Sequence, residues 1–120
     1  MAAKDDLGRA GEERAVRHLL VSGYEVLDRN WRCPLGEIDI VAARRGCLCV
    51  IEVKTRSSAR YGHPFEALDA RKVRRLWRLA HAWVAAHPDL AIHSHVRLEA
   101  IGIIGADPGT GVLEHLVDLR

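Results

Sequence analysis

Three ionisable side chains lie in apolar segments where burying a charge is costly. Asp39 lies within Ile38-Asp39-Ile40-Val41, and Glu52 and Lys54 follow the apolar residues of the next segment. Side chains alternate between the two faces of a strand, so Glu52 and Lys54 are expected to share a face. Carboxylate oxygens are the ligands that hard divalent cations prefer, so the two acids indicate a site for Mg²⁺ or Mn²⁺.

The connection between the two segments decides whether these acids meet. We expect strands at 37–43 and 47–55, and the short connection between them predicts an antiparallel hairpin. A turn centred on Arg45-Gly46 places Asp39 directly opposite Glu52, with Cβ atoms about 5 Å apart. A three-residue loop, a bulge or a one-residue slip would change the pairing, and the sequence leaves these alternatives open.

Facing carboxylates repel each other, so their charge must be offset. Lys54 supplies one positive charge, and a divalent cation would supply the rest. We expect Asp39 and Glu52 to bind such a cation directly, with the carbonyl oxygen of Val53 as a third ligand. The alternative is a structural ion-pair network in which Lys54 bridges the acids and no metal binds.

The first predicted helix, residues 5–21, adds a fourth acid. Glu12 lies on the same stripe as the apolar residues of this helix and is expected to face the sheet, where it would act through a water or hold a second ion. Its neighbour Glu13 is expected to be an exposed partner of an arginine, with Arg17 at the favourable helical spacing.

The remaining elements complete one α/β domain over residues 1–120. Apolar periodicity and turn residues predict the order α-β-β-β-α-β-β, with a central mixed five-stranded sheet flanked by helices. The apolar residues on both faces of the third strand indicate a central position in this sheet. The other predicted strands are 24–31, 91–104 and 112–117, the second helix is 69–86, and 57–66 is a polar loop.

A basic segment follows the lysine strand. The chain has a net charge of only +2, but residues 56–82 hold seven basic side chains against two acidic ones. Such a local excess favours a polyanion, which makes nucleic acid the expected partner. A solvated helix face is the alternative for the arginines of the second helix. The basic residues are Arg56, Arg60, Arg71, Lys72, Arg74, Arg75 and Arg78.

Other classes of function are disfavoured. The three cysteines, Cys33, Cys47 and Cys49, have neither disulfide nor zinc-site spacing, and His93 and His95 lack a third ligand at a recognisable spacing. Trp77 and Trp83 are expected to pack in the core. No apolar run approaches the length of a membrane span, and residues 1–6 lack a signal-peptide core, so we expect a cytoplasmic protein with no membrane partner.

Several short motifs, in order along nearly the whole chain, resemble a known family. Asp39 followed by Glu52-Val53-Lys54 resembles the PD-(D/E)XK nuclease motif, and the chain is similar to the YraN-type family of small bacterial proteins, related to archaeal Holliday-junction resolvases. Glu99 departs from the aspartate expected at its position. The motifs are Gly8-x-x-Gly11-Glu12, Asn30-Trp31-Arg32, 36–41, 52–56, Tyr61-Gly62-x-Pro64, Arg71-Lys72 and 113–116.

The resemblance implies a restriction-endonuclease-like fold and a nuclease-type site made of Glu12, Asp39, Glu52 and Lys54. It implies a Mg²⁺-dependent, structure-selective endonuclease acting on DNA, with branched DNA as a candidate substrate. Lys54 would orient the attacking water. Two alternatives are a nucleic-acid-binding module that cuts slowly or not at all, and a protein-interaction domain on the same fold. Symmetric cutting of a junction would require a homodimer.

Overall fold

One mixed sheet of five strands, in the spatial order β1-β2-β3-β4-β5, organises the chain. The computed structural model describes residues 2–60, 62–91 and 95–119. All neighbouring strands are antiparallel except β3 and β4, which are parallel. The elements are α1 (Ala2–Val21), β1 (Glu25–Cys33), β2 (Gly36–Arg44), β3 (Cys47–Arg56), η1 (Pro64–Ala67), α2 (Ala70–Ala86), α3 (Pro88–Ala91), β4 (His95–Ile104) and β5 (Val112–Val117).

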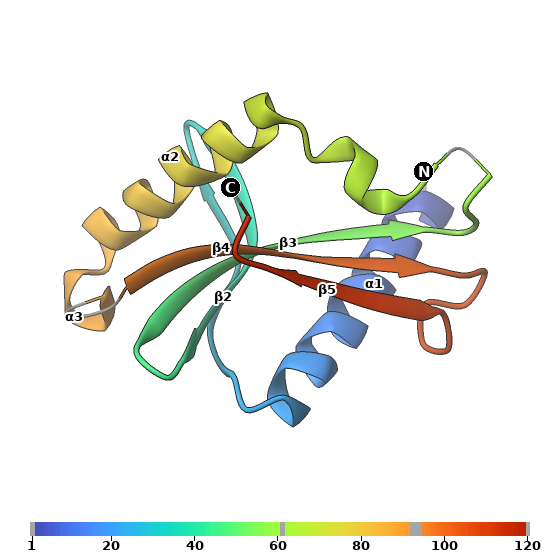
Figure 1. The fold of residues 1–120 in the computed structure, drawn as a ribbon, viewed down its shortest axis with the longest axis horizontal. Coiled ribbons are helices and arrows are strands. Elements are labelled where there is room, and N and C mark those ends of the chain that lie inside the picture. The colour runs from blue at the N-terminus through green and yellow to red at the C-terminus, as the bar shows by residue number, and fades with distance from the viewer. Residues whose placement is uncertain (1, 61, 92–94, 120) are drawn as a thin grey trace.

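The two long helices cover opposite faces of the sheet, which gives three layers (Figure 1). Cys49 and Ile51 of β3 belong to the core cluster that contains α1 residues, whereas Leu48 and Val50 belong to the cluster that contains α2 residues. All four side chains are fully buried, so β3 has the central position predicted from its apolar sequence. The predicted α/β class and element order are confirmed. None of the described helices is both long and apolar enough to cross a membrane.

Two predicted boundaries were wrong. The predicted polar loop ends in the 3₁₀ helix η1, which begins at Pro64 and is capped by the His63 side chain. His87-Pro88 ends α2 as predicted, but Pro88 also begins α3, because proline is well suited to the first position of a helix. Ala91 therefore lies in α3 and not in the predicted strand. Tyr61 and His93 lie outside the described residues.

A two-residue turn sets the register of the central hairpin. Arg44 pairs with Cys47, and the two residues between them, Arg45 and Gly46, have φ angles of 49° and 79°. Positive φ at both central residues is the signature of a type I′ turn, whose twist matches that of the flanking strands. Of the alternatives left open by the sequence, the two-residue turn is the one found.

Gly11 lies where α1 packs closely against β3. A Cβ atom added at Gly11 would collide with Oγ1 of Thr55, whereas one added at Gly8 would meet nothing within 4 Å. We expect Gly11→Ala to lower the free energy of unfolding by about 1–2 kcal/mol through overpacking. The control, Gly8→Ala, should raise it by up to about 1 kcal/mol, since alanine favours a helix. Urea denaturation measures both, and equal effects would contradict this packing.

Candidate active site

Asp39 lies where β2 and β3 separate. The pairing of these strands ends with Ile40 and Ile51, so Asp39 and Glu52 are the first residues beyond the ladder, in the register that the two-residue turn predicts. The N–H of Val53 would bond the main chain of β2 if the ladder continued. Oδ2 of Asp39 accepts this N–H instead, at 2.8 Å. The carboxylate thus takes the place of a ladder hydrogen bond and is fixed against β3.

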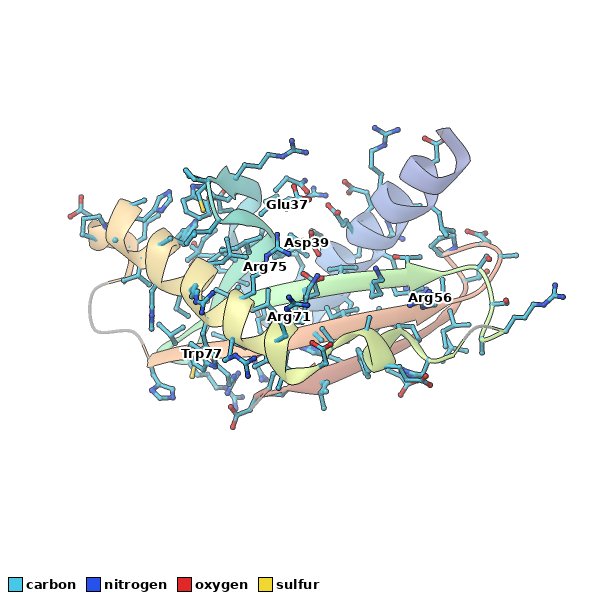
Figure 2. All side chains as sticks on the ribbon, turned by 90° about the horizontal axis from the view of Figure 1, so that it is seen from above. Glu37, Asp39, Arg56, Arg71, Arg75 and Trp77 are labelled. Atoms are coloured by element: carbon cyan, nitrogen blue, oxygen red, sulfur yellow. The ribbon has the colours of Figure 1, made fainter. Side chains whose placement is uncertain are left out.

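Asp39 and Glu52 line the same open pocket, of about 470 Å³, below one flank of α2. Figure 2 shows Glu37, Asp39 and Arg75 gathered on this side of α2. Glu52 is only 14% exposed, and its Oε2 lies 3.3 Å from Nζ of Lys72. The charged side chains that line the pocket are Arg32, Glu37, Asp39, Glu52, Lys72 and Arg75.

The carboxyl group of Asp39 is strongly perturbed. Burial raises its pKa to about 7, and the negative charge of Glu52 is the next largest cause. Glu12 and Glu37 raise the pKa further, while the hydrogen bond from the Val53 N–H lowers it. Since burial is the largest cause, the raised pKa reflects mainly the cost of an ionised carboxylate in this position, and a cation beside Asp39 and Glu52 would lower that cost.

Glu12 approaches this site from α1. Its negative charge contributes to the raised pKa of Asp39, although Glu12 does not line the pocket. Burial also raises the pKa of Glu12 itself, whereas a hydrogen bond with the side chain of Asn30 lowers it. The backbone of Asn30 has a positive φ of 53°. Glu13 is exposed as expected, but its arginine partner is Arg29 in β1, at 2.7 Å, and not Arg17 on its own helix.

Lys54 shares the face of β3 that carries Glu52, because the two residues are two positions apart on the strand. It does not line the pocket beside Asp39, and the lysine paired with Glu52 is Lys72 from α2. Val53, which lies between Glu52 and Lys54 in the sequence, pairs with Ile101 of the parallel strand β4. The structure therefore brings Asp39 and Glu52 into one pocket with Lys72, Arg75 and Glu37, whereas Glu12 and Lys54 do not line it.

The donor set fits a hard divalent cation. No three His, Cys, Asp or Glu side chains of the described residues form a ready cluster for a metal ion. Mg²⁺, however, is commonly held by one or two carboxylates, several waters and substrate phosphate oxygens. Asp39 and Glu52 supply two such carboxylates on adjacent strands, with the Val53 carbonyl as a candidate further donor.

The predicted basic residues fall into three groups. Four of them line a second pocket on α2, while Arg74 is exposed on the same helix and lines neither pocket. Arg56 and Arg60 lie at the end of β3 and in the following loop; Nε of Arg56 is buried and has no hydrogen-bond partner among the described residues. The four pocket residues are Arg71, Lys72, Arg75 and Arg78.

A buried network on the α1 side of the sheet escaped the sequence analysis. Glu99 is fully buried and accepts hydrogen bonds from Tyr24, Arg97 and His115 at 3.0, 2.9 and 2.7 Å. Because a carboxylate only accepts, Nε2 of His115 donates to Glu99, while Nδ1 of His115 lies within hydrogen-bond distance of Nε2 of His18, at 3.0 Å. The sequence signal was a single glutamate inside an apolar strand.

The cysteines and tryptophans agree with the sequence analysis. Cys33, Cys47 and Cys49 are free thiols, and burial raises the pKa of Cys49 to about 12, so its thiol is protonated at neutral pH. Trp83 is fully buried and Trp77 packs against the same core cluster.

Comparison with known proteins gives the chain a family. The model of the family described as "Uncharacterised protein family UPF0102" matches residues 11–103. The chain belongs to this family. UPF0102 proteins of Clavibacter michiganensis and Paenarthrobacter aurescens are 44% and 49% identical to it; the alignments cover 94% and 97% of this chain and 97% and 94% of the relatives. One from an Arthrobacter species is 47% identical, with 97% of both chains covered.

The segment matched by the UPF0102 model contains Glu12, Asp39 and Glu52, together with the pocket-lining residues of α2. It ends within β4, so His115 of the buried network lies beyond it. The whole-length relatives nevertheless extend the likeness across nearly all of the chain.

Proposed function

We propose that this protein is a metal-dependent nuclease that hydrolyses phosphodiester bonds in DNA, with branched DNA as the preferred substrate. One observation carries the proposal: Asp39 and Glu52 share a pocket with Lys72 and Arg75, and the pKa of Asp39 is raised to about 7. A divalent cation would complement the acids, and a phosphate group would complement the bases.

The roles follow from this arrangement. Asp39 and Glu52 would hold Mg²⁺ or Mn²⁺, with the Val53 carbonyl and Glu12 as further donors. When bound, the cation supplies charge neutralisation at the phosphate and a water of lowered pKa. Arg75 would donate hydrogen bonds to phosphate oxygens as negative charge develops on them. For Lys54, which shares the Glu52 face of β3 but does not line the pocket, the role of orienting that water comes from the resemblance to the nuclease motif. Hydrolysis then leaves a phosphate monoester and a hydroxyl.

A second candidate is a nucleic-acid-binding module that cuts slowly or not at all. The ion pair between Lys72 and Glu52 favours it, since Lys72 already offsets the charge that a metal would offset. In this candidate the basic side chains bind the phosphate backbone, and Asp39 remains protonated up to about pH 7.

Cleavage assays separate these candidates. Purified protein is incubated with linear, flapped and four-way DNA, in Mg²⁺, Mn²⁺ or chelator. We expect cutting with either metal and none with chelator, and Glu52→Gln and Lys54→Ala should each abolish it. The control variant, Glu13→Gln, removes a carboxylate of α1 that is 57% exposed, and it should cut DNA like the parent protein.

Each other result identifies a different function. Binding of DNA without metal-dependent cutting would support the binding module, and the lack of any salt-sensitive DNA binding would leave a protein-interaction domain. Cutting that survives Glu52→Gln would point to a contaminant. Symmetric cuts in a four-way junction require two sites, so we also propose a homodimer, to be checked by sedimentation on the junction.

A further inference from the structure

A second pocket, of about 440 Å³, adjoins the carboxylate pocket on α2. We call it the arginine pocket: its basic side chains are Arg71, Lys72, Arg75 and Arg78. Lys72 and Arg75 line both pockets, so they form a shared wall. Figure 2 shows Arg71 and Arg75 on α2, with Arg75 towards Asp39.

The positive charge of the arginine pocket is only partly offset by the protein, through the pair of Lys72 with Glu52 and the nearby carboxylate of Asp69. Asp69 is the acidic residue that lines it, and its carboxylate caps α2 by accepting the Lys72 N–H at 2.9 Å. Within residues 2–60, 62–91 and 95–119, no carboxylate forms an ion pair with Arg71, Arg75 or Arg78. Converging arginines repel one another, so an anion bound among them would be stabilised.

Gly36 lets Arg75 lie directly over the carboxylate pocket. A Cβ atom added at Gly36 would lie 2.9 Å from Nη2 of Arg75, and the φ of Gly36 is 139°, which side chains other than glycine rarely adopt. The guanidinium is thus packed against the main chain at the start of β2, three residues before Asp39. From there its N–H donors can reach an anion in either pocket.

We propose that the arginine pocket holds the phosphate that neighbours the scissile phosphate on the same strand, so the substrate is a polynucleotide and not a phosphate monoester or a single nucleotide. This inference rests on the proposed function. Arg75 would contact both phosphates, while Arg78 and Arg71 would contact only the neighbouring one. Bidentate arginine–phosphate pairing explains why arginines, and not lysines, dominate this pocket.

Binding measured in chelator tests the inference separately from cleavage. The affinity of the full-length protein for a DNA oligonucleotide is titrated against salt. Arg75→Ala and Arg78→Ala should each weaken binding about tenfold at low salt and lower the log–log salt slope by about 0.7–0.9, the contribution of one phosphate contact. Arg74→Ala removes the same charge from an exposed position outside both pockets and should leave the slope unchanged.

A scan of the oligonucleotide identifies the phosphate. A neutral methylphosphonate is placed at one linkage at a time. We expect binding to weaken most at one internal linkage, and this loss to shrink in the Arg75→Ala/Arg78→Ala variant, because Arg71 is then the remaining contact of the neighbouring phosphate.

Several outcomes would overturn the arginine pocket as a backbone site. These are equal losses for Arg74→Ala and Arg78→Ala, a methylphosphonate effect that is undiminished in the double variant, an effect confined to the terminal linkage, or no binding at all. A linkage-specific effect without cleavage of any DNA in Mg²⁺ would refute the nuclease and leave this site. Cleavage in Mg²⁺ that is unaffected by Arg75→Ala and by Arg78→Ala would support the nuclease and refute the arginine pocket as a phosphate site.

Discussion

Asp39→Asn is expected to make the protein more stable above pH 7 and, at the same time, inactive in metal-dependent cleavage. The physical cause of both effects is the cost of an ionised Asp39, whose pKa is raised to about 7 by burial and by the charge of Glu52. Asparagine keeps a side-chain oxygen that can accept the Val53 N–H, which Asp39 accepts at 2.8 Å, but it carries no charge.

The sign of the pH dependence follows from the raised pKa. Asp39 in the unfolded chain loses its proton near its ordinary value of 3.8, whereas the folded protein keeps it until about pH 7. Between these values the folded state binds the extra proton, so the parent protein loses stability as the pH rises from about 4 to about 7. The amide introduced by Asp39→Asn does not titrate, so the variant has no such loss. It should therefore gain up to about 4 kcal/mol relative to the parent between pH 4 and pH 8.

Urea denaturation at pH 5 and pH 8, without divalent cations, measures this gain. A variant less stable than the parent at pH 8 would contradict the assignment of an uncompensated charge to Asp39. The cleavage rate should fall at least about a thousandfold, since a lost charged ligand forfeits several kcal/mol of transition-state stabilisation. If Asp39→Asn is more stable than the parent at pH 8 but the parent does not cleave DNA, the raised pKa of Asp39 is supported and the nuclease is refuted.

Local rules were sufficient to predict the centre of the site. A two-residue turn fixes the register of a hairpin, so the position of Arg45-Gly46 alone placed Asp39 opposite Glu52. Helical spacing likewise placed Glu12 on the face of α1 that meets the sheet. Both predictions depend on residues close together in the chain, where periodicity and turn geometry leave few alternatives.

The partners that cross between elements could not be predicted in this way. Lys72 was expected to bind nucleic acid, yet its ammonium group lies 3.3 Å from Glu52, twenty positions earlier in the chain. Periodicity identifies the faces of α2 but not how the helix lies along the sheet, and that placement decides which basic residues reach the acids. Glu37 is a different case, since alternation along β2 places it on the face of Asp39 two positions away, and this signal was not used.

The largest stability loss is expected at Glu99, which pairs with Ile51 next to Glu52 but whose side chain lies on the α1 side of the sheet. This carboxylate is fully buried, and hydrogen bonds from His115, Tyr24 and Arg97 keep its pKa below the ordinary value in spite of burial. Glu99→Gln leaves the Arg97 guanidinium beside a neutral amide. Removing one partner of a buried ion pair costs about 3–5 kcal/mol. The Arg97 side chain is 23% exposed and can turn partly towards water, so we expect the lower end, about 3 kcal/mol.

At low pH, the parent and the Glu99→Gln variant should differ less in their free energy of unfolding. Because the folded pKa of Glu99 is lowered, its contribution to stability is present above the ordinary value of 4.5 and is lost as the pH falls through the folded pKa. Denaturation at pH 7 and at pH 3 compares the two proteins. As control, Glu13→Gln breaks the exposed pair with Arg29 and should cost at most about 1 kcal/mol at either pH. Equal costs at Glu99 and Glu13 would mean that the buried carboxylate is not held as an ion.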